Sequence, residues 1–248
     1  MTDVISLSEA GMVNSLHRLT LISHNLANAN TNGFRRDIAL SEPFQVRLEQ
    51  LMSASGELFS SGQSDRMVPQ TRSVLDVASG SLRYTGNALD FAIEGDGYFE
   101  FSGPNGVRYS RRGVFTQDAA GQLVTADGLT VQGLSGPLRL SNGEPRVDRE
   151  GVIWIDEKHV GQLKIAHFAD PTKLEKVGDN YLRIGGASIV ENAPPSVVRQ
   201  GHVEGSNVDA MTEMVGMMST LRHLEITQRV VTGYDEIMDT AIKTIGEF

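Results

Sequence analysis

The chain has 248 residues, of which 40% are hydrophobic and 21% charged, which is ordinary for a globular protein with one large or two small domains. It has no cysteine, which excludes disulfides, thiolate zinc sites and a cysteine nucleophile. The formal net charge of −9 argues against binding nucleic acid by phosphate neutralisation, so we expect no nucleic-acid partner.

Targeting signals are weak in this sequence. No stretch approaches the roughly 18 consecutive apolar residues of a membrane-spanning helix, so we expect no direct membrane insertion. Residues 1–6 lack the basic, apolar and small-residue regions of a cleavable signal peptide. The protein is therefore expected either to stay in the cytoplasm or to be exported by a route that reads no cleavable signal.

The first predicted element is an amphipathic helix over residues 3–33. Gly33 suits a left-handed position at its end, and Phe34 can make the apolar contact that often follows one. Leu16 lies beside the main apolar stripe. The stripe itself repeats every seven residues, at Ile5, Met12, Leu19 and Leu26.

The next predicted region, residues 34–75, is of mixed composition and broken by serine, glycine and proline. From about residue 76 to 205, glycines separate short apolar runs, which indicates many short strands and tight turns. Residues 89–101 alternate around Gly95-Asp96-Gly97, which predicts a hairpin, and Pro104-Asn105-Gly106 predicts the next turn. We expect a self-contained antiparallel domain.

The last predicted element is a long helix over residues 208–246, with no proline after Pro195. Asp209 near its start and Lys243 near its end favour the helix dipole. Its apolar stripe again repeats in sevens, at Ala210, Met217, Leu224, Val231, Met238 and Ile245, with Met214, Leu221 and Ile242 beside it.

These elements predict an α+β fold in which long N- and C-terminal helices form a coiled-coil-like rod domain, with a central antiparallel all-β domain inserted between them. The expected boundaries are 1–34 for the N-terminal helix, 35–75 for an extended linker, 76–205 for the β domain and 206–248 for the C-terminal helix.

Both predicted helices carry apolar residues off the main stripe. They are Val13 and Leu21 in the first helix and Met211, Val215 and Met218 in the second. A two-helix pair cannot cover these faces, which favours packing between molecules. The alternative is a third layer within the chain, formed by a short amphipathic helix at residues 42–52.

Motifs for chemistry are absent. The six histidines form no HExxH pattern and no cluster at metal-ligand spacing, so we expect no metal and no cofactor. Asp90 and Glu94 share a strand face, but a glycosidase pair would also need a sugar cleft. Arg35-Arg36 and residues 110–113 are short basic patches, expected to be solvated or to anchor an interface. We expect no enzyme activity.

Four stretches together resemble the flagellar basal-body rod and hook family. They are residues 25–34, 89–99, 109–128 and 201–208, and the resemblance covers nearly the whole chain. It implies a structural rod subunit that stacks helically on copies of itself and on proximal and distal rod proteins. It further implies that the protein is exported by the flagellar type III apparatus and lies in the rod that crosses the periplasm. There it would transmit torque, form part of the wall of the export channel and contact a surrounding ring.

Within that family, the C-terminal helix lacks the aromatic and asparagine residues usual in the distal rod type; the corresponding positions are Leu224 and Thr227. This favours the proximal rod type, with the distal type second. Asn25, Asn28 and Asn32 would share a helix face that sets alignment between neighbours, or a polar face lining the channel. The rival classes are an envelope carbohydrate-binding or carbohydrate-cleaving protein and a secreted adhesin or effector.

Overall fold

The structure is a computed structural model that describes residues 2–41, 71–140, 143–178, 180–191 and 196–246. It divides into two compact units, which are described separately. The helical unit contains Met1–Leu26, Asp37–Val74 and Asp209–Phe248, and the β unit contains Ala27–Arg36 and Leu75–Val208. The short helix considered for residues 42–52 lies outside the described residues.

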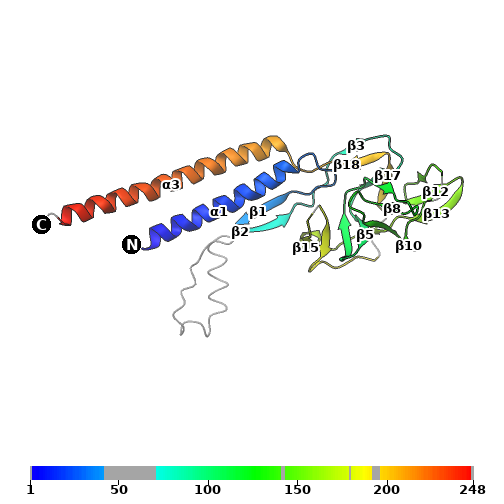
Figure 1. Cartoon of the computed structure of the whole chain (residues 1–248), viewed down its shortest axis with the longest axis horizontal. Coiled ribbons are helices and arrows are strands. Elements are labelled where there is room, and N and C mark those ends of the chain that lie inside the picture. Colours follow the sequence, from blue (N-terminus) through cyan, green and yellow to red (C-terminus); the bar gives the residue numbers. More distant parts are fainter. Residues whose placement is uncertain (1, 42–70, 141–142, 179, 192–195, 247–248) are drawn as a thin grey trace, which may run out of the picture. The chain divides into compact units, whose positions relative to one another are not determined.

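The helical unit contains two helices, α1 (Thr2–Ala27) and α3 (Ala210–Gly246), and a pair of strands, β1 (Asp37–Ser41) and β2 (Thr71–Leu75). The helices run side by side in opposite directions (Figure 1). Asp209 begins α3 as an N-cap, because its Oδ1 accepts a hydrogen bond from the Met211 N–H at 3.1 Å.

The face of α1 that is buried in this unit combines the small or polar residues Ala10, Ser15 and Asn25 with one large apolar residue, Ile22. Asn25 of α1 donates to Glu213 of α3 at 3.4 Å, and Gly216 lies close to Ile22. A cavity of about 360 Å³ lies between the two helices and β1. Its lining residues are Gly11, Asn14, Ser15, Arg18, Ala39, Ser219, Thr220 and His223.

The predicted fold class is therefore wrong in its central feature. Within the described residues there are two helices and a large antiparallel β region, and α1, with 26 residues, is shorter than the predicted helix. A coiled-coil seam needs large apolar residues facing each other, whereas a cavity lined by small and polar residues lies between these helices. Leu16, Met214 and Leu221, predicted in or beside the seam, are exposed.

The early end of α1 has a second consequence. The helix stops at Ala27, so Asn28 and Asn32 do not continue the helical face of Asn25. Gly33 has the predicted positive φ of 68°, but it lies six residues beyond the helix end and belongs to the β unit. The shared asparagine face expected from the spacing is therefore not formed.

The β unit is built from short antiparallel strands and one 3-10 turn, η1 (Pro171–Lys173). The strands are β3 (Leu82–Tyr84), β4 (Phe91–Glu94), β5 (Tyr98–Gly103), β6 (Gly106–Ser110), β7 (Thr116–Gln117), β8 (Leu123–Val124), β9 (Thr130–Gly133), β10 (Gly136–Pro137), β11 (Arg146–Val147), β12 (Val152–Ile155), β13 (Lys158–Gln162), β14 (Ile165–Ala166), β15 (Leu174–Lys176), β16 (Leu182–Ile184), β17 (Val197–Gln200) and β18 (His202–Glu204).

The largest sheet has the order β15-β16-β6-β5-β9-β8-β7, with β10 beside β9 and β14 beside β5. Three smaller sheets pair β11-β12-β13, β17-β4 and β18-β3. β5 is buried on both faces: Phe99 and Phe101 enter the main core, whereas Tyr98 packs with Tyr109 and Phe168 in a second cluster. The alternation of side chains along this strand thus connects two cores.

The predicted hairpin at residues 89–101 is wrong, although both of its strands exist. β4 pairs with β17, and β5 pairs with β6, β9 and β14, so the Gly95-Asp96-Gly97 turn joins strands of different sheets. The predicted turn at Pro104-Asn105-Gly106 is confirmed, because Gly103 pairs with Gly106 across the β5–β6 hairpin.

Candidate functional site

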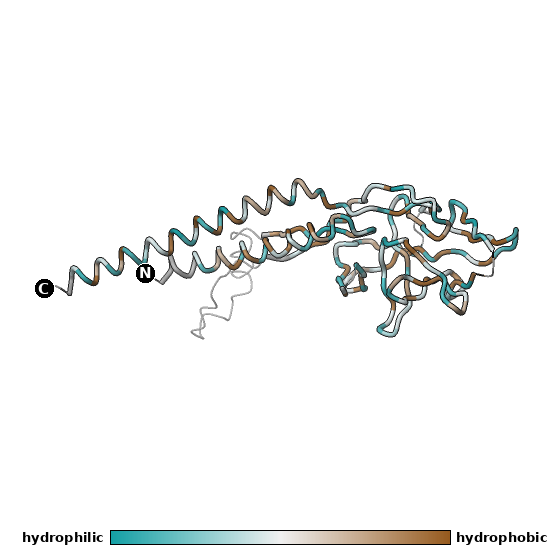
Figure 2. Tube along the Cα trace, turned by 45° about the horizontal axis from the view of Figure 1, so that its top comes forward, coloured by the Kyte–Doolittle hydropathy of each residue, from teal (hydrophilic) through white to brown (hydrophobic). Residues whose placement is uncertain are grey.

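The exposed face of α3 is the first candidate site. Near its start, Met211, Val215 and Met218 expose 72%, 58% and 53% of their surfaces. Figure 2 shows apolar and polar segments alternating along the whole helix. Farther along, Ile226, Val230 and Ile237 are also exposed, at spacings of four and seven residues. This is more apolar surface than a single helix normally leaves in water.

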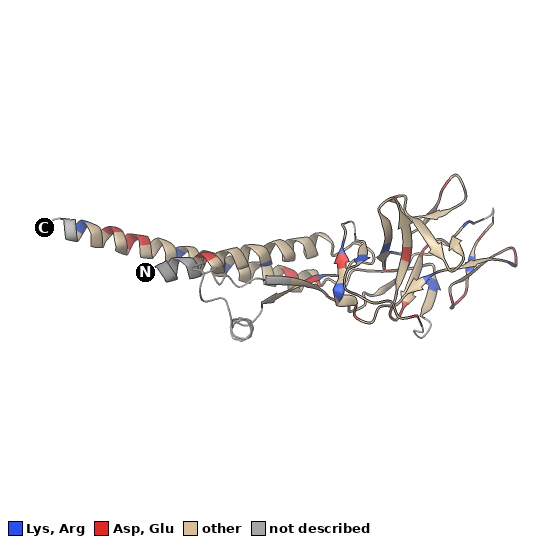
Figure 3. Ribbon diagram, turned by 90° about the horizontal axis from the view of Figure 1, so that it is seen from below, with Lys and Arg blue, Asp and Glu red and all other residues tan. Residues whose placement is uncertain are grey.

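Charged residues of both signs share α3 with these apolar residues (Figure 3). Lys243 and Asp239, for example, form an ion pair of 2.6 Å one turn apart. Among the described residues, no helix is long and apolar enough to cross a membrane. Exposed apolar residues interspersed with charged ones, as on this face of α3, are typical of a protein-contact surface.

The residues predicted for the assembly interface fall into different environments. Ile5 and Ile245 lie in α1 and α3, but their side chains are outside the described part. Asn25, Gly33 and Phe34 are buried within their units. Leu16, Met214, Leu221 and Ile242 are exposed, and Met12, Leu19, Leu26, Asn28, Asn32, Met217, Leu224, Val231 and Met238 are half-buried. Ile226, Val230 and Ile237 were not predicted for the interface, although their spacing of four and seven residues was an available signal.

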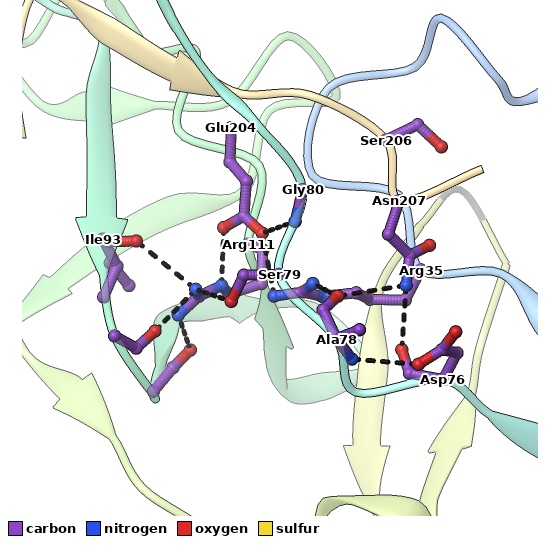
Figure 4. Close-up of polar contacts among 12 residues, drawn as sticks. Arg35, Asp76, Ala78, Ser79, Gly80, Ile93, Arg111, Glu204, Ser206 and Asn207 are labelled. Carbon is purple, nitrogen blue, oxygen red and sulfur yellow. Dashed lines mark hydrogen bonds and ion pairs between the residues drawn. The ribbon is translucent and has the colours of Figure 1, made fainter. Parts of the chain in front are cut away.

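The second candidate site is a buried ion cluster centred on Glu204, inside the β unit (Figure 4). Its Oε1 lies 2.8 Å from Arg35 Nη2, and its Oε2 lies 2.7 Å from Arg111 Nε. The Gly80 N–H also donates to Oε1 at 3.0 Å. Only 1% of the Glu204 side chain is exposed, so all three contacts are shielded from water.

Arg111 extends this cluster to the turn between β4 and β5. Its Nη1 donates to the Gly97 carbonyl at 2.6 Å, and its Nη2 donates to the Gly95 carbonyl at 2.7 Å. Burial lowers the pKa of Arg111, and the Glu204 carboxylate opposes that effect. The guanidinium therefore stabilises the turn through hydrogen bonds to backbone carbonyls. Sequence patterns do not predict these contacts.

The same region of the β unit contains the segment that follows α1. The Gly33 N–H donates to the Glu204 carbonyl at 2.7 Å, and Arg35 also donates to the Ala78 carbonyl. Arg36 pairs with Asp76 at 2.7 Å. The cluster thus joins residues 33–36, 76–80 and 204–207 to the core of the β unit.

Two basic patches from the sequence analysis are corrected by this geometry. Arg35 and Arg111 were expected to be solvated or to anchor an interface, yet their side chains are only 5% and 2% exposed. They are interior because one carboxylate, Glu204, compensates both. The burial of these arginines depends on Glu204, which is so far away in the chain that no sequence spacing relates it to them.

A cavity of about 660 Å³ in the β unit contains an arrangement that resembles a nucleophile and its base. His167 Nε2 lies 2.8 Å from Ser196 Oγ. The Ser196 hydroxyl also donates to the Asp96 carbonyl, an arrangement in which the imidazole donates to the serine oxygen. These hydrogen bonds connect Ser196 to the turn between β4 and β5 and to His167.

The carboxylates considered for catalysis also have structural partners. Asp90 accepts hydrogen bonds from Thr85 Oγ1 at 2.7 Å and from Asn87 Nδ2 at 3.1 Å. Glu94 pairs with Arg199 at 2.6 Å, and this hydrogen bond lowers the pKa of Glu94. Within the described part of the chain, no three histidine or acidic side chains are grouped to hold a metal ion.

Two family models match this chain. Residues 199–244 match the flagellar basal body rod FlgEFG protein C-terminal model, and residues 92–167 match the flagellar hook protein FlgE/F/G D1 domain model. They cover most of α3 and the centre of the β unit. The chain is thus of the rod and hook class of bacterial flagellar proteins.

Relatives define the family further. A flagellar basal-body rod protein FlgF from Mesorhizobium japonicum is 33% identical over 240 residues, covering 92% of each chain. A FlgG from Agrobacterium fabrum is 30% identical over 260 residues, covering 97% of this chain and 98% of the relative. The chain belongs to the flagellar basal-body rod family and is FlgF-like, which confirms the predicted family. It is a structural subunit of the flagellar basal-body rod.

Proposed function

We propose that this chain is a proximal-type rod subunit that assembles through the exposed apolar side chains of α3, together with those of α1. The observation that carries the proposal is the exposure of Met211, Val215 and Met218 along one side of α3. Their neighbours in the rod would be copies of this chain and other rod proteins.

The physical reason is the free energy of burying apolar surface. Covering one large apolar side chain contributes about 1.5–3 kcal/mol, so several such residues per subunit can hold neighbours together. A contact between two different faces that does not close into a ring generates a helical filament. Stacked subunits of this kind would transmit torque and enclose a channel for exported proteins, and the outer part of the assembly would meet a surrounding ring.

The experiment replaces Met218 by glutamate and tests the variant in a strain that lacks the native protein. We expect loss of motility and loss of this protein from isolated basal bodies, because a charge in the contact must be desolvated. Glu225→Gln, at an exposed polar position on the same helix, is the matched control. Normal incorporation of Met218→Glu would contradict the proposal. Unchanged fluorescence of Trp154 would show that the β unit is still folded.

A further inference from the structure

Three exposed side chains form a row across the three-stranded sheet of the β unit. Trp154 on β12 pairs with Arg146 on β11 and with His159 on β13, so one member comes from each strand. Cross-strand partners point to the same side of a sheet. Trp154 is the only tryptophan in the sequence, and 39% of its surface is exposed.

A bulge in β13 creates this row. Ile153 pairs with Gly161, but the next residue, Trp154, pairs with His159, which leaves Val160 as an extra residue. Val160 packs against the main core. In a regular ladder Trp154 would face Val160, so the bulge sends the valine inward and turns His159 outward beside the indole. The two rings meet edge to face, with centroids 5.6 Å apart.

The chemistry of the row defines what it can bind. Arg146 and the indole of Trp154 are hydrogen-bond donors without an acceptor atom. Neighbouring strands lie about 4.8 Å apart, so the Arg146 guanidinium and the His159 imidazole flank the indole over a width of about 10 Å. Asp156 and Glu157 occupy the hairpin turn, beyond the Ile155–Lys158 pair. A complementary ligand has an apolar group that covers the indole and an anionic acceptor on the side of Arg146.

We propose that this row binds an acidic segment of a partner protein, in which a carboxylate lies beside an apolar side chain. Charge complementarity carries this choice, because the flanking Arg146 matches a carboxylate. Tryptophan and arginine are also the residues enriched at the energetic centres of protein interfaces. Small ligands and sugars prefer concave sites, whereas the row stands on the outer face of a sheet and lines none of the cavities described above. The row belongs to the β unit, and the exposed face of α3 belongs to the helical unit.

The test uses the full chain and a synthetic peptide with the sequence Gly-Glu-Leu-Glu-Gly, blocked at both ends. Trp154 is the reporter, since its fluorescence is the only indole signal. We expect a saturable change that weakens as salt is added. The peptide with both glutamates replaced by glutamine should bind at least about tenfold more weakly, because its groups no longer pair with the guanidinium.

Variants separate a specific site from general attraction. Arg146→Gln should reduce the affinity at least about tenfold, whereas Arg183→Gln, which removes an exposed charge on β16, should leave it unchanged. Amide NMR shifts on β11–β13 provide a readout that does not depend on the indole. Equal effects of the two variants, or no saturable response to the acidic peptide, overturn the proposal. A saturable response to N-acetylglucosamine oligomers and not to the peptide overturns it in favour of a glycan site.

Discussion

Asn25 and Asp37 exchange two hydrogen bonds that tie α1 to the first strand of the helical unit. Asn25 Nδ2 donates to the Asp37 carbonyl at 2.9 Å, and the Asp37 N–H donates back to Asn25 Oδ1 at 2.9 Å. The Asn25 side chain is buried, with 2% exposed, and also reaches Glu213 at 3.4 Å. The Asn25 side-chain amide therefore forms the two hydrogen bonds to the Asp37 backbone that a neighbouring strand would otherwise form.

Replacing Asn25 by alanine should destabilise the helical unit by about 1–3 kcal/mol, because the Asp37 N–H is left without its acceptor. Asn25→Asp should be worse, since a second carboxylate would face Glu213. Hydrogen exchange of the Asp37 amide measures the effect, and Ser23→Ala, at an exposed position of α1, is the control. Equal protection in Asn25→Ala and Ser23→Ala would show that the exchange of hydrogen bonds is unimportant.

Glu204→Gln should lower the free energy of unfolding of the β unit by about 3–5 kcal/mol, because two buried guanidinium groups lose their only shared carboxylate. Urea unfolding followed by Trp154 fluorescence measures the change. The matched control is Glu175→Gln, whose partner Arg183 is 61% exposed. That exposed pair should contribute less than about 1 kcal/mol. Similar losses in both variants would contradict a special role for Glu204.

Local signals in the sequence predicted the local features of this fold. The turn at Pro104-Asn105-Gly106 and the positive φ at Gly33 depend on neighbouring residues, and both are present. The apolar residues off the α3 stripe, such as Met211 and Met218, are exposed as their position suggested.

Features that depend on distant residues were not predictable in this way. Glu204 and Arg111 are 93 residues apart, and no periodicity relates them. The seven-residue repeat identified an apolar stripe on each helix, but the buried face of α1 contains Ser15 and Asn25. Helical periodicity shows where apolar residues lie on a helix. In α1, hydrogen bonding and small side chains determine which face is buried against the rest of the unit.

Alkaline pH should unfold the β unit through its buried tyrosines. Burial raises the pKa of Tyr181 to about 12 and the pKa of Tyr109 to about 12, from 10.0. The folded state thus favours the neutral phenols, so their contribution is complete below pH 10.0 and is lost as the pH rises towards 12.

Urea midpoints measured between about pH 9 and about pH 11.5 should therefore fall with pH, and Tyr181→Phe should flatten the fall. The Tyr181→Phe variant loses the hydrogen bond to Asp127 at every pH, so the comparison concerns the slope and not the absolute midpoint. Absorbance at the phenolate band follows the ionisation directly. Identical slopes for the wild-type chain and for a variant lacking both Tyr181 and Tyr109 would exclude these groups as the cause.

Gly33 is a position at which a single added methyl group should be strongly destabilising. A Cβ atom there would lie 2.4 Å from Arg112 N and 2.5 Å from Arg111 C, which are backbone atoms that cannot move independently of the Glu204 cluster. Gly128 has a similar positive φ of 77° but no atom within 4 Å of such a Cβ. Gly128→Ala should therefore lower the free energy of unfolding only by the cost of a positive φ, about 1–2 kcal/mol. Gly33→Ala should lower it by more than about 3 kcal/mol, because the close contact adds to that cost. Urea unfolding of the two variants separates the destabilisation caused by the close contact from that caused by backbone strain. Equal losses of stability would mean that the backbone of residues 111–112 shifts to accommodate the methyl group.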